Sequence, residues 1–311
     1  MKFICYLRAA WVSSVLMMIA NAGASEPGDR TFNLEEVAPG VFVHQGRQVG
    51  INHAARGDSA NIGFVVGNSC VAVIDAGGSF ATGRALRARI KTQTPTPICF
   101  VINTHAHFDH LLGNAAFLVD RPKFVGHANL TAVIAASREY FLDRFAKELA
   151  GAPAPHIIAP NLQVAEGEEL VLDLGARQLR LVAHPLAHSP ADLTVLDVST
   201  NILWAGDLLF VERLPVLDGS LKGWQHWMQQ AAPVPYARVI PGHGPLSGWP
   251  DAVIPQQRYL DTLQATVTQA LKDGDFLEDV VAGAHAAPPD WQVPGAHARN
   301  LSKAYRELEW Q

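Results

Sequence analysis

The heptapeptide THAHFDH, residues 104–110, places three histidines and one aspartate directly after the apolar run ICFVIN. His105 and His107 are two positions apart, so both can reach one cation from an extended or turning backbone. Asp109 and His110 belong to the next turn and can face a second cation. Zinc and other borderline divalent metals prefer imidazole and carboxylate ligands, and the motif contains no cysteine for a structural zinc knuckle. The segment therefore predicts a metal site at the end of a strand.

Three further residues of the same chemical types stand at the ends of other predicted strands. His188 lies in AHSPADLTV between two strands, Asp207 follows NILWAG, and His243 lies in IPGHGP after the strand RVIP. Strand ends are where side chains from distant segments gather in a cleft. We therefore expect these three residues to join those of THAHFDH in one site.

Short apolar strands separated by turns must position this site. In chain order they are GVFVH, NIGFVVG, SCVAVID, ICFVINTH, KFVGH, LVLDLG, QLRLVAH, LTVLDV, NILWAGD and RVIPGHG. Between SCVAVID and ICFVINTH, apolar residues recur at helical spacing from Phe80 to Ile90 after a Ser79 cap, which predicts a crossover between parallel strands. Further helices are expected over 128–150, 221–232 and 255–274. The pattern predicts an α/β (α+β) fold with two sheets packed face to face and helices on the outsides.

The order of the polar residues resembles that of the metallo-β-lactamase superfamily, which has a strand-end Asp, then HxHxDH, then His, Asp and His. The matching residues are Asp75, His105, His107, Asp109, His110, His188, Asp207 and His243. The resemblance runs from about Val37 to His243. It implies a four-layer αββα sandwich and a metal-dependent hydrolase.

The resemblance also implies a role for each residue. One zinc ion would be held by His105, His107 and His188. The other would be held by Asp109, His110 and His243. Asp207 would bridge the two ions, which iron or manganese can replace, and Asp75 would accept hydrogen bonds that stiffen the histidine loop. Two such ions lower the pKa of a shared water from about 15.7 towards neutrality, and Asp109 would orient the resulting hydroxide towards the substrate.

The first 24 residues have the pattern of a secretory signal. Lys2 and Arg8 precede the apolar run AAWVSSVLMMIA, and Ala22 and Ala24 are placed for cleavage before Ser25. Because the run is shorter than the roughly 20 residues that span a bilayer, we expect cleavage and no retained membrane anchor. Residues 25–311 would then form a single domain in the periplasm.

The charge balance limits the expected partners. The chain has 24 Lys and Arg against 29 Asp and Glu, a formal charge of -5, and no dense basic run that would neutralise a row of phosphates. Nucleic acid is therefore not expected. We expect a small-molecule substrate and, because the chain also resembles proteins of quinoprotein relay systems, a periplasmic redox or quinoprotein partner.

Membership of the superfamily leaves the substrate open, because function lies in loops carried by the fold. A carboxylate at Asp207 is similar to the pattern of thioesterase, lactonase and phosphodiesterase branches, whereas true β-lactamases typically have Cys or Ser there. The signal and the segments AHSPADLTV and WAGDLLFVERLPVLDGS resemble exported quinoprotein relay system zinc metallohydrolases, which are related to hydrolases encoded with bacterial sulfur-oxidation systems. We therefore predict hydrolysis of an ester, thioester, lactone or related bond. The alternatives are a mononuclear iron oxygenase similar to persulfide dioxygenases, a β-lactamase, and a non-catalytic metal-binding protein.

A few other residues carry weaker signals. Cys70 and Cys99 lie on two predicted strands and form either a disulfide or two buried thiols. Asp218, Gly219 and Ser220 follow the Asp207 motif closely enough to reach the rim of the cleft. His127 follows the strand KFVG and is assigned to the surface or a loop.

Overall fold

Two β-sheets form the centre of the fold. The first has seven strands in chain order: β1 (Glu35–Ala38), β2 (Val41–His44), β3 (Ile62–Val66), β4 (Val71–Ile74), β5 (Ile98–Ile102), β6 (Lys123–His127) and β7 (Leu162–Val164). The second has six strands in the order β13 (Ser247–Gly248), β12 (Arg238–His243), β11 (Ile202–Phe210), β10 (Leu193–Asp197), β9 (Gln178–Ala183) and β8 (Glu169–Asp173). All ten predicted strands are present, and β1, β7 and β13 are short strands that the alternation of apolar residues did not reveal.

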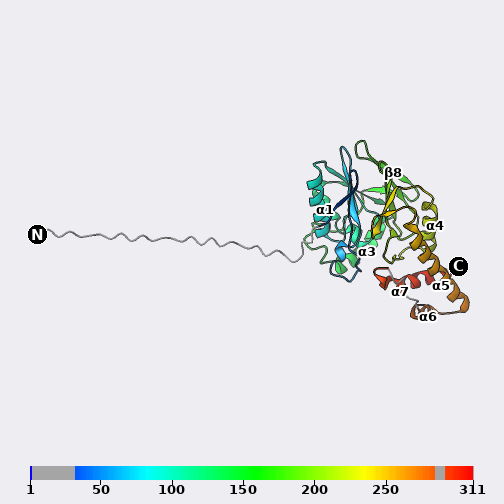
Figure 1. The fold of residues 1–311 in the computed structure, drawn as a ribbon. Helices are drawn as coiled ribbons and strands as arrows, with labels where there is room; N and C mark the ends of the chain where they lie inside the picture. Colours follow the sequence, from blue (N-terminus) through cyan, green and yellow to red (C-terminus); the bar gives the residue numbers. More distant parts are fainter. Residues whose placement is uncertain (2–31, 284–290, 311) are drawn as a thin grey trace. The chain divides into compact units, whose positions relative to one another are not determined.

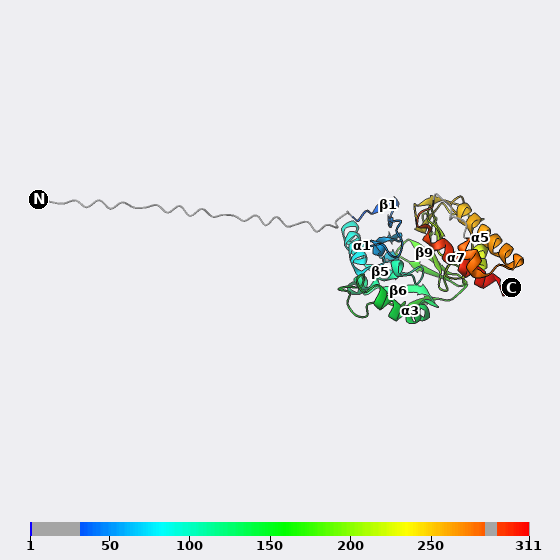
Figure 2. The ribbon, with the colours of Figure 1, turned by 90° about the horizontal axis from the view of Figure 1, so that it is seen from below.

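Helices cover the outer faces of this pair of sheets. The α-helices of the described residues are α1 (Phe80–Gln93), α2 (Phe108–Leu111), α3 (Leu130–Arg144), α4 (Leu221–Ala231), α5 (Val253–Asp273), α6 (Leu277–Ala282) and α7 (His297–Leu308). Figures 1 and 2 show α1 and α5 on opposite sides of the two sheets. Helix α1 begins where predicted, because the Ser79 side chain accepts a hydrogen bond from the Thr82 amide at 3.0 Å. The strands that α1 joins, β4 and β5, pair in parallel as expected for a crossover.

Alternating side chains make each strand contribute to two apolar layers. Val71 and Val73 of β4 point outward and pack with Leu86 and Ile90 of α1. The intervening residue Ala72 belongs to the layer between the sheets, as do Ile74 of β4 and residues of the second sheet such as Leu181 and Trp204. The order helix, sheet, sheet, helix is the four-layer αββα sandwich that the sequence predicted.

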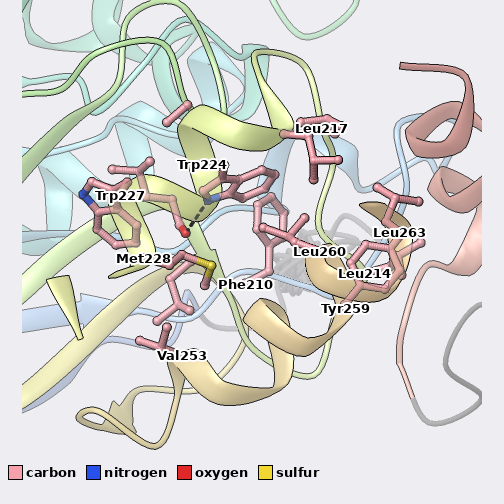
Figure 3. Close-up of a cluster of buried hydrophobic side chains, with 14 of the residues drawn as sticks. Phe210, Leu214, Leu217, Trp224, Trp227, Met228, Val253, Tyr259, Leu260 and Leu263 are labelled. Carbon is pink, nitrogen blue, oxygen red and sulfur yellow. Dashed lines mark hydrogen bonds between the residues drawn. The ribbon is translucent and has the colours of Figure 1, made fainter. Parts of the chain in front are cut away.

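Helices α4 and α5 form an apolar layer on the outer face of the second sheet. Trp224 and Met228 of α4 pack with Leu260 and Leu263 of α5 in the cluster drawn in Figure 3. The Trp224 indole nitrogen donates a hydrogen bond to the backbone oxygen of Leu208, at 2.9 Å, so this large buried ring has its polar atom satisfied. Both helices were expected from the sequence, and they pack against each other through their apolar residues.

The computed structural model describes residue 1, residues 32–283 and residues 291–310, so residues 2–24 of the predicted signal lie outside the described part. Contacts group Phe32–Gln311 into one unit. Within the described ranges, no helix combines the length and apolar character needed to cross a membrane. Cys70 and Cys99 form a disulfide that joins the start of β4 to β5, which decides between the two alternatives for these cysteines.

Candidate metal centre

The ends of β5 and β12, the interior of β11 and two loops bring the predicted residues together. Asp207 was expected just after a strand, but it lies within β11, where the pairing with β12 is irregular. The loop after β5 carries His105 and His107, and the short helix α2 that follows carries Asp109 and His110. The seven residues fall into two groups in which ligand atoms lie within 4.8 Å of one another. The first group is His105, His107, His188 and Asp207, and the second is Asp109, His110 and His243. Apart from Asp207, which the resemblance placed between the two ions, each group contains the residues that the resemblance assigned to one ion, and their binding of metal stays a prediction.

The Asp207 carboxylate faces both groups, one oxygen to each. Its Oδ2 lies 3.5 Å from Nε2 of His105 and 3.5 Å from Nε2 of His188. Its Oδ1 lies 3.1 Å from Nε2 of His110 and 3.3 Å from Nε2 of His243. Asp207 is therefore placed between two sets of nitrogen atoms.

Hydrogen bonds at the rear of the rings fix the orientation of the second group. His110 donates from Nδ1 to Oδ2 of Asp75, at 2.8 Å, and His243 donates from Nδ1 to the backbone oxygen of Ser59, also at 2.8 Å. A neutral imidazole carries one proton, so each of these rings presents an unprotonated Nε2 to the cluster.

Two rings of the first group, those of His107 and His105, are oriented in a similar way. His107 donates from Nε2 to Oδ2 of Asp218, at 3.1 Å, so its Nδ1 faces the cluster. The Thr104 hydroxyl donates to Asp75 and accepts from Nδ1 of His105, at 3.0 Å, so Nε2 of His105 faces the cluster. Asp218, which the sequence placed at the rim of the cleft, thus touches a predicted ligand directly.

These orientations fit a divalent cation. Nε2 of His105, Nε2 of His110 and Oδ1 of Asp207 are buried and have no hydrogen-bond partner among the described residues. Unpaired buried acceptors are costly, by about 1–3 kcal/mol each. Lone pairs of nitrogen and carboxylate oxygen that converge on one space are the donor set of zinc and similar metals. The histidine and aspartate residues present therefore suit a bound divalent metal.

The electrostatics of the cluster agree with that fit. Burial alone would lower the pKa of His110, but the carboxylates of Asp207 and Asp75 outweigh burial and raise this pKa well above its usual value. Burial also lowers the pKa of His107, yet Asp207 and Asp218 raise it to about 9. The cluster thus attracts positive charge, which a metal ion would supply in place of these protons.

Backbone geometry holds the supporting residues close. Asp75 has φ +54°, in the left-handed region, and its carboxylate accepts hydrogen bonds from the Thr104 amide, the Thr104 hydroxyl and His110, each at 2.8 Å. A Cβ at Gly242 would lie 2.0 Å from Oδ1 of Asp207, so only glycine permits β12 to pass this close to the carboxylate.

Some features of the site were not anticipated. Ser59 donates from its hydroxyl to Oδ2 of Asp109, at 2.8 Å, and Thr104 links His105 to Asp75. Thr104 is the first residue of THAHFDH, so its proximity to the site could be predicted, whereas Ser59 comes from a loop whose sequence has no recognisable pattern. The assignment of His127 to the surface or a loop was wrong: it ends β6 and is fully buried, because its Nδ1 accepts from the Asn129 amide and its Nε2 donates to the His184 backbone oxygen.

A separate groove of about 670 Å³ lies between α5, α6 and α7. Tyr259, Leu263 and Trp291 line it, and none of the seven metal-binding candidates does. We place the functional site at the histidine and aspartate cluster, because its ligand atoms converge to within 4.8 Å of one another in each group, as binding of a metal requires.

Comparison with known proteins decides the family. A sequence profile of the metallo-β-lactamase superfamily matches residues 55–243, which is more than half of the chain. The chain belongs to the metallo-β-lactamase superfamily. Its fold and its histidine and aspartate clusters are those of a metal-dependent hydrolase of this superfamily. A search of curated proteins returned no significant match.

Solved structures of superfamily members share the fold. The sec-alkylsulfatase Pisa1 from Pseudomonas sp. is 18% identical with a TM-score of 0.64, over 89% of this chain and 50% of the alkylsulfatase. The metallo-β-lactamase from Pontibacter korlensis is 19% identical with a TM-score of 0.58, over 74% of this chain and 98% of that protein. The metallo-β-lactamase from Hirschia baltica is 19% identical with a TM-score of 0.57, over 73% of this chain and 96% of that protein. The present chain spans about half the length of the alkylsulfatase, and identities this low show the fold alone.

Proposed function

We propose that this member of the superfamily is an exported dinuclear zinc hydrolase that acts on an ester, thioester, lactone or related bond. The observation that carries the proposal is the position of Asp207, whose two oxygens face two separate groups of histidine nitrogens. A carboxylate that faces both groups suits two adjacent cations better than one.

The protein's own residues would prepare the attack. Two bound zinc ions would supply a water of lowered pKa and polarise the bond to be cleaved. Asp109 would orient the attacking water, because Ser59 donates to its Oδ2 and fixes the plane of the carboxylate. Asp75 would keep the proton of His110 on Nδ1, away from the cluster.

The exposed part of the site indicates where a substrate would enter. The His107 side chain is 27% exposed and the Asp218 side chain 37%, whereas those of His188 and His110 are fully buried. We propose that the scissile bond approaches from the side of His107 and Asp218. The buried Trp224 ring packs against His188, with the two ring centroids 5.1 Å apart.

Export to the periplasm is part of the same proposal. The signal pattern in residues 1–24 and the disulfide between Cys70 and Cys99 support it, because disulfides persist in oxidising compartments. The resemblance to quinoprotein relay metallohydrolases suggests a periplasmic redox or quinoprotein partner, which would be sought by co-purification.

Rival functions differ in metal and substrate. A mononuclear iron oxygenase needs one metal, and the second group of Asp109, His110 and His243 would then have no function. A β-lactamase would share the metal site and differ in the bond cleaved. The alkylsulfatase likeness adds sulfate esters to the bonds that deserve screening.

The test is to replace Asp207 with Ala and with Asn and to measure zinc content and hydrolysis together. We expect zinc to fall from about two ions per chain to one or fewer, and hydrolysis of a panel of esters, thioesters, lactones, β-lactams and sulfate esters to fall at least about 100-fold. The control is Asp197→Asn, which removes a buried carboxylate paired with Arg177 and remote from the cluster. Two-metal occupancy in both Asp207 variants would refute the bridging role.

A further inference from the structure

Arg213 is held beside the second group of metal-binding residues. It follows the end of β11, where the Val211 amide donates to the backbone oxygen of His243, at 2.9 Å. On its other side the Leu214 amide donates to the backbone oxygen of Gln292, at 3.0 Å. Arg213 lies between these two anchors, and its charge interacts with the carboxylates of Asp109 and Asp207.

Two of the three nitrogens of the Arg213 guanidinium, Nε and Nη1, are buried without a direct partner. The residue is only 6% exposed, and neither Nε nor Nη1 has a hydrogen-bond acceptor within the described part of the chain. Among the described residues, no carboxylate oxygen lies within 4.0 Å of an Arg213 guanidinium nitrogen, the distance that defines an ion pair. Other arginines behave differently: Arg56 and Arg177 each hold a carboxylate with two nitrogens.

An unpaired buried guanidinium is unfavourable for folding alone. Burial lowers the pKa of Arg213, and the attraction of Asp109 and Asp207 only partly offsets it. Burying a charge without a hydrogen-bond partner destabilises a protein by several kcal/mol. Groups that destabilise the fold and lie beside reactive residues are typical of binding sites, where a ligand supplies the missing partner.

The geometry of the missing partner follows from guanidinium chemistry. Each planar fork of Arg pairs Nη2 with either Nε or Nη1 and donates two parallel hydrogen bonds to a carboxylate, sulfate or phosphate, and a neutral carbonyl cannot match their strength. With two divalent cations bound, the positive charges at the site outnumber the negative charges of Asp109 and Asp207. Both features favour an anionic ligand.

We infer that Arg213 binds an oxyanion of the substrate, so that the substrate is an ester, thioester, lactone or related compound that also carries a carboxylate, sulfate or phosphate group. The inference rests on the proposed function for the scissile bond. It adds a specificity-determining residue that neither the motif order nor the family profile assigns.

The test measures oxyanion binding directly. Zinc-loaded protein is titrated calorimetrically with sodium sulfate, sodium phosphate and sodium succinate against sodium chloride of equal ionic strength. We expect Arg213→Gln to weaken the tightest of these three interactions by about 10-fold to 100-fold, as expected for the loss of a hydrogen bond to a charged group. Arg213→Lys, which keeps the charge but not the fork, should lose less affinity than Arg213→Gln. The control is Arg180→Gln, which breaks an exposed pair with Glu169 and should retain wild-type affinity.

A stability measurement separates binding from structural support. If Arg213 serves a ligand, the zinc-loaded Arg213→Gln protein should melt at or above the wild-type temperature, because an unpaired buried charge has been removed. Equal oxyanion affinity in wild type and Arg213→Gln would overturn the inference, as would wild-type protein that binds none of the three anions. Arg213-dependent anion binding without hydrolysis of any screened bond would leave the inference standing and count against the proposed function alone.

Discussion

Replacing Asp75 with Asn should weaken metal binding although Asp75 is not itself a proposed ligand. Its carboxylate accepts three hydrogen bonds, from the Thr104 amide at Oδ1 and from the Thr104 hydroxyl and His110 Nδ1 at Oδ2. An asparagine can accept at only one of the two positions, because the other becomes a donor.

The magnitude depends on which position the amide nitrogen takes. At the Oδ2 position it faces Nδ1–H of His110, so the proton of the ring moves to Nε2, the atom that lies 3.1 Å from Asp207 and must face a metal. At the Oδ1 position it faces the Thr104 amide and leaves a buried donor unsatisfied, which costs about 1–3 kcal/mol of stability. Loss of such an orienting partner typically weakens metal affinity 10-fold to 100-fold, or about 1.4–2.7 kcal/mol.

The assay is zinc affinity measured by competition with a chromophoric chelator, together with urea unfolding of the metal-free protein. Asp197→Asn is the matched control, because Asp197 is also fully buried and holds Arg177 with both oxygens. The control should lose stability and keep zinc affinity, whereas Asp75→Asn should lose zinc affinity. Wild-type affinity for both zinc ions in Asp75→Asn would refute the reasoning.

Two further predictions concern the scaffold. The Arg56 hydrogen bonds hold the pKa of Glu148 below its usual value of 4.5, against the smaller effect of burial, so Glu148→Gln should lower the free energy of unfolding by about 1.5–3 kcal/mol at pH 7. This stabilisation is complete above the unfolded pKa of Glu148, near 4.5, and is lost as pH falls through the lower folded pKa. Urea unfolding at several pH values should therefore show that the difference in unfolding free energy between wild type and Glu148→Gln shrinks in acid. A difference that stays constant with pH would contradict the prediction. The disulfide joins residues 29 apart, so replacing Cys70 and Cys99 with Ser should lower the free energy of unfolding by roughly 3–4 kcal/mol. Denaturant titration of the wild type and the double variant measures this difference, and an unchanged unfolding midpoint would disprove the prediction.

Much of the fold could be predicted because the relevant signals are local. The apolar run SCVAVID predicts a strand, and because successive side chains of a strand point to opposite faces, Val71 and Val73 lie in one apolar layer and Ala72 and Ile74 in another. The strands β7 and β13 are too short, at three and two residues, for alternation to be detected.

The site divides in the same way. The metal-binding candidates share one chemistry and a recognisable order, so sequence could group them. Ser59 and Asp218 form hydrogen bonds with residues 50 and 111 positions away, and Arg213 interacts with the charges of Asp109 and Asp207. Nothing in the local sequence of these three residues requires those interactions. His127 was misassigned for a related reason, since its burial depends on the His184 backbone oxygen from a distant loop.

The most direct test of the central proposal is elemental analysis of the purified protein by plasma mass spectrometry, without added metal and reported as zinc and iron per chain. The two groups of ligand atoms joined by Asp207 predict about two zinc ions per chain. About one iron per chain with little zinc would contradict a dinuclear zinc hydrolase and favour the iron oxygenase.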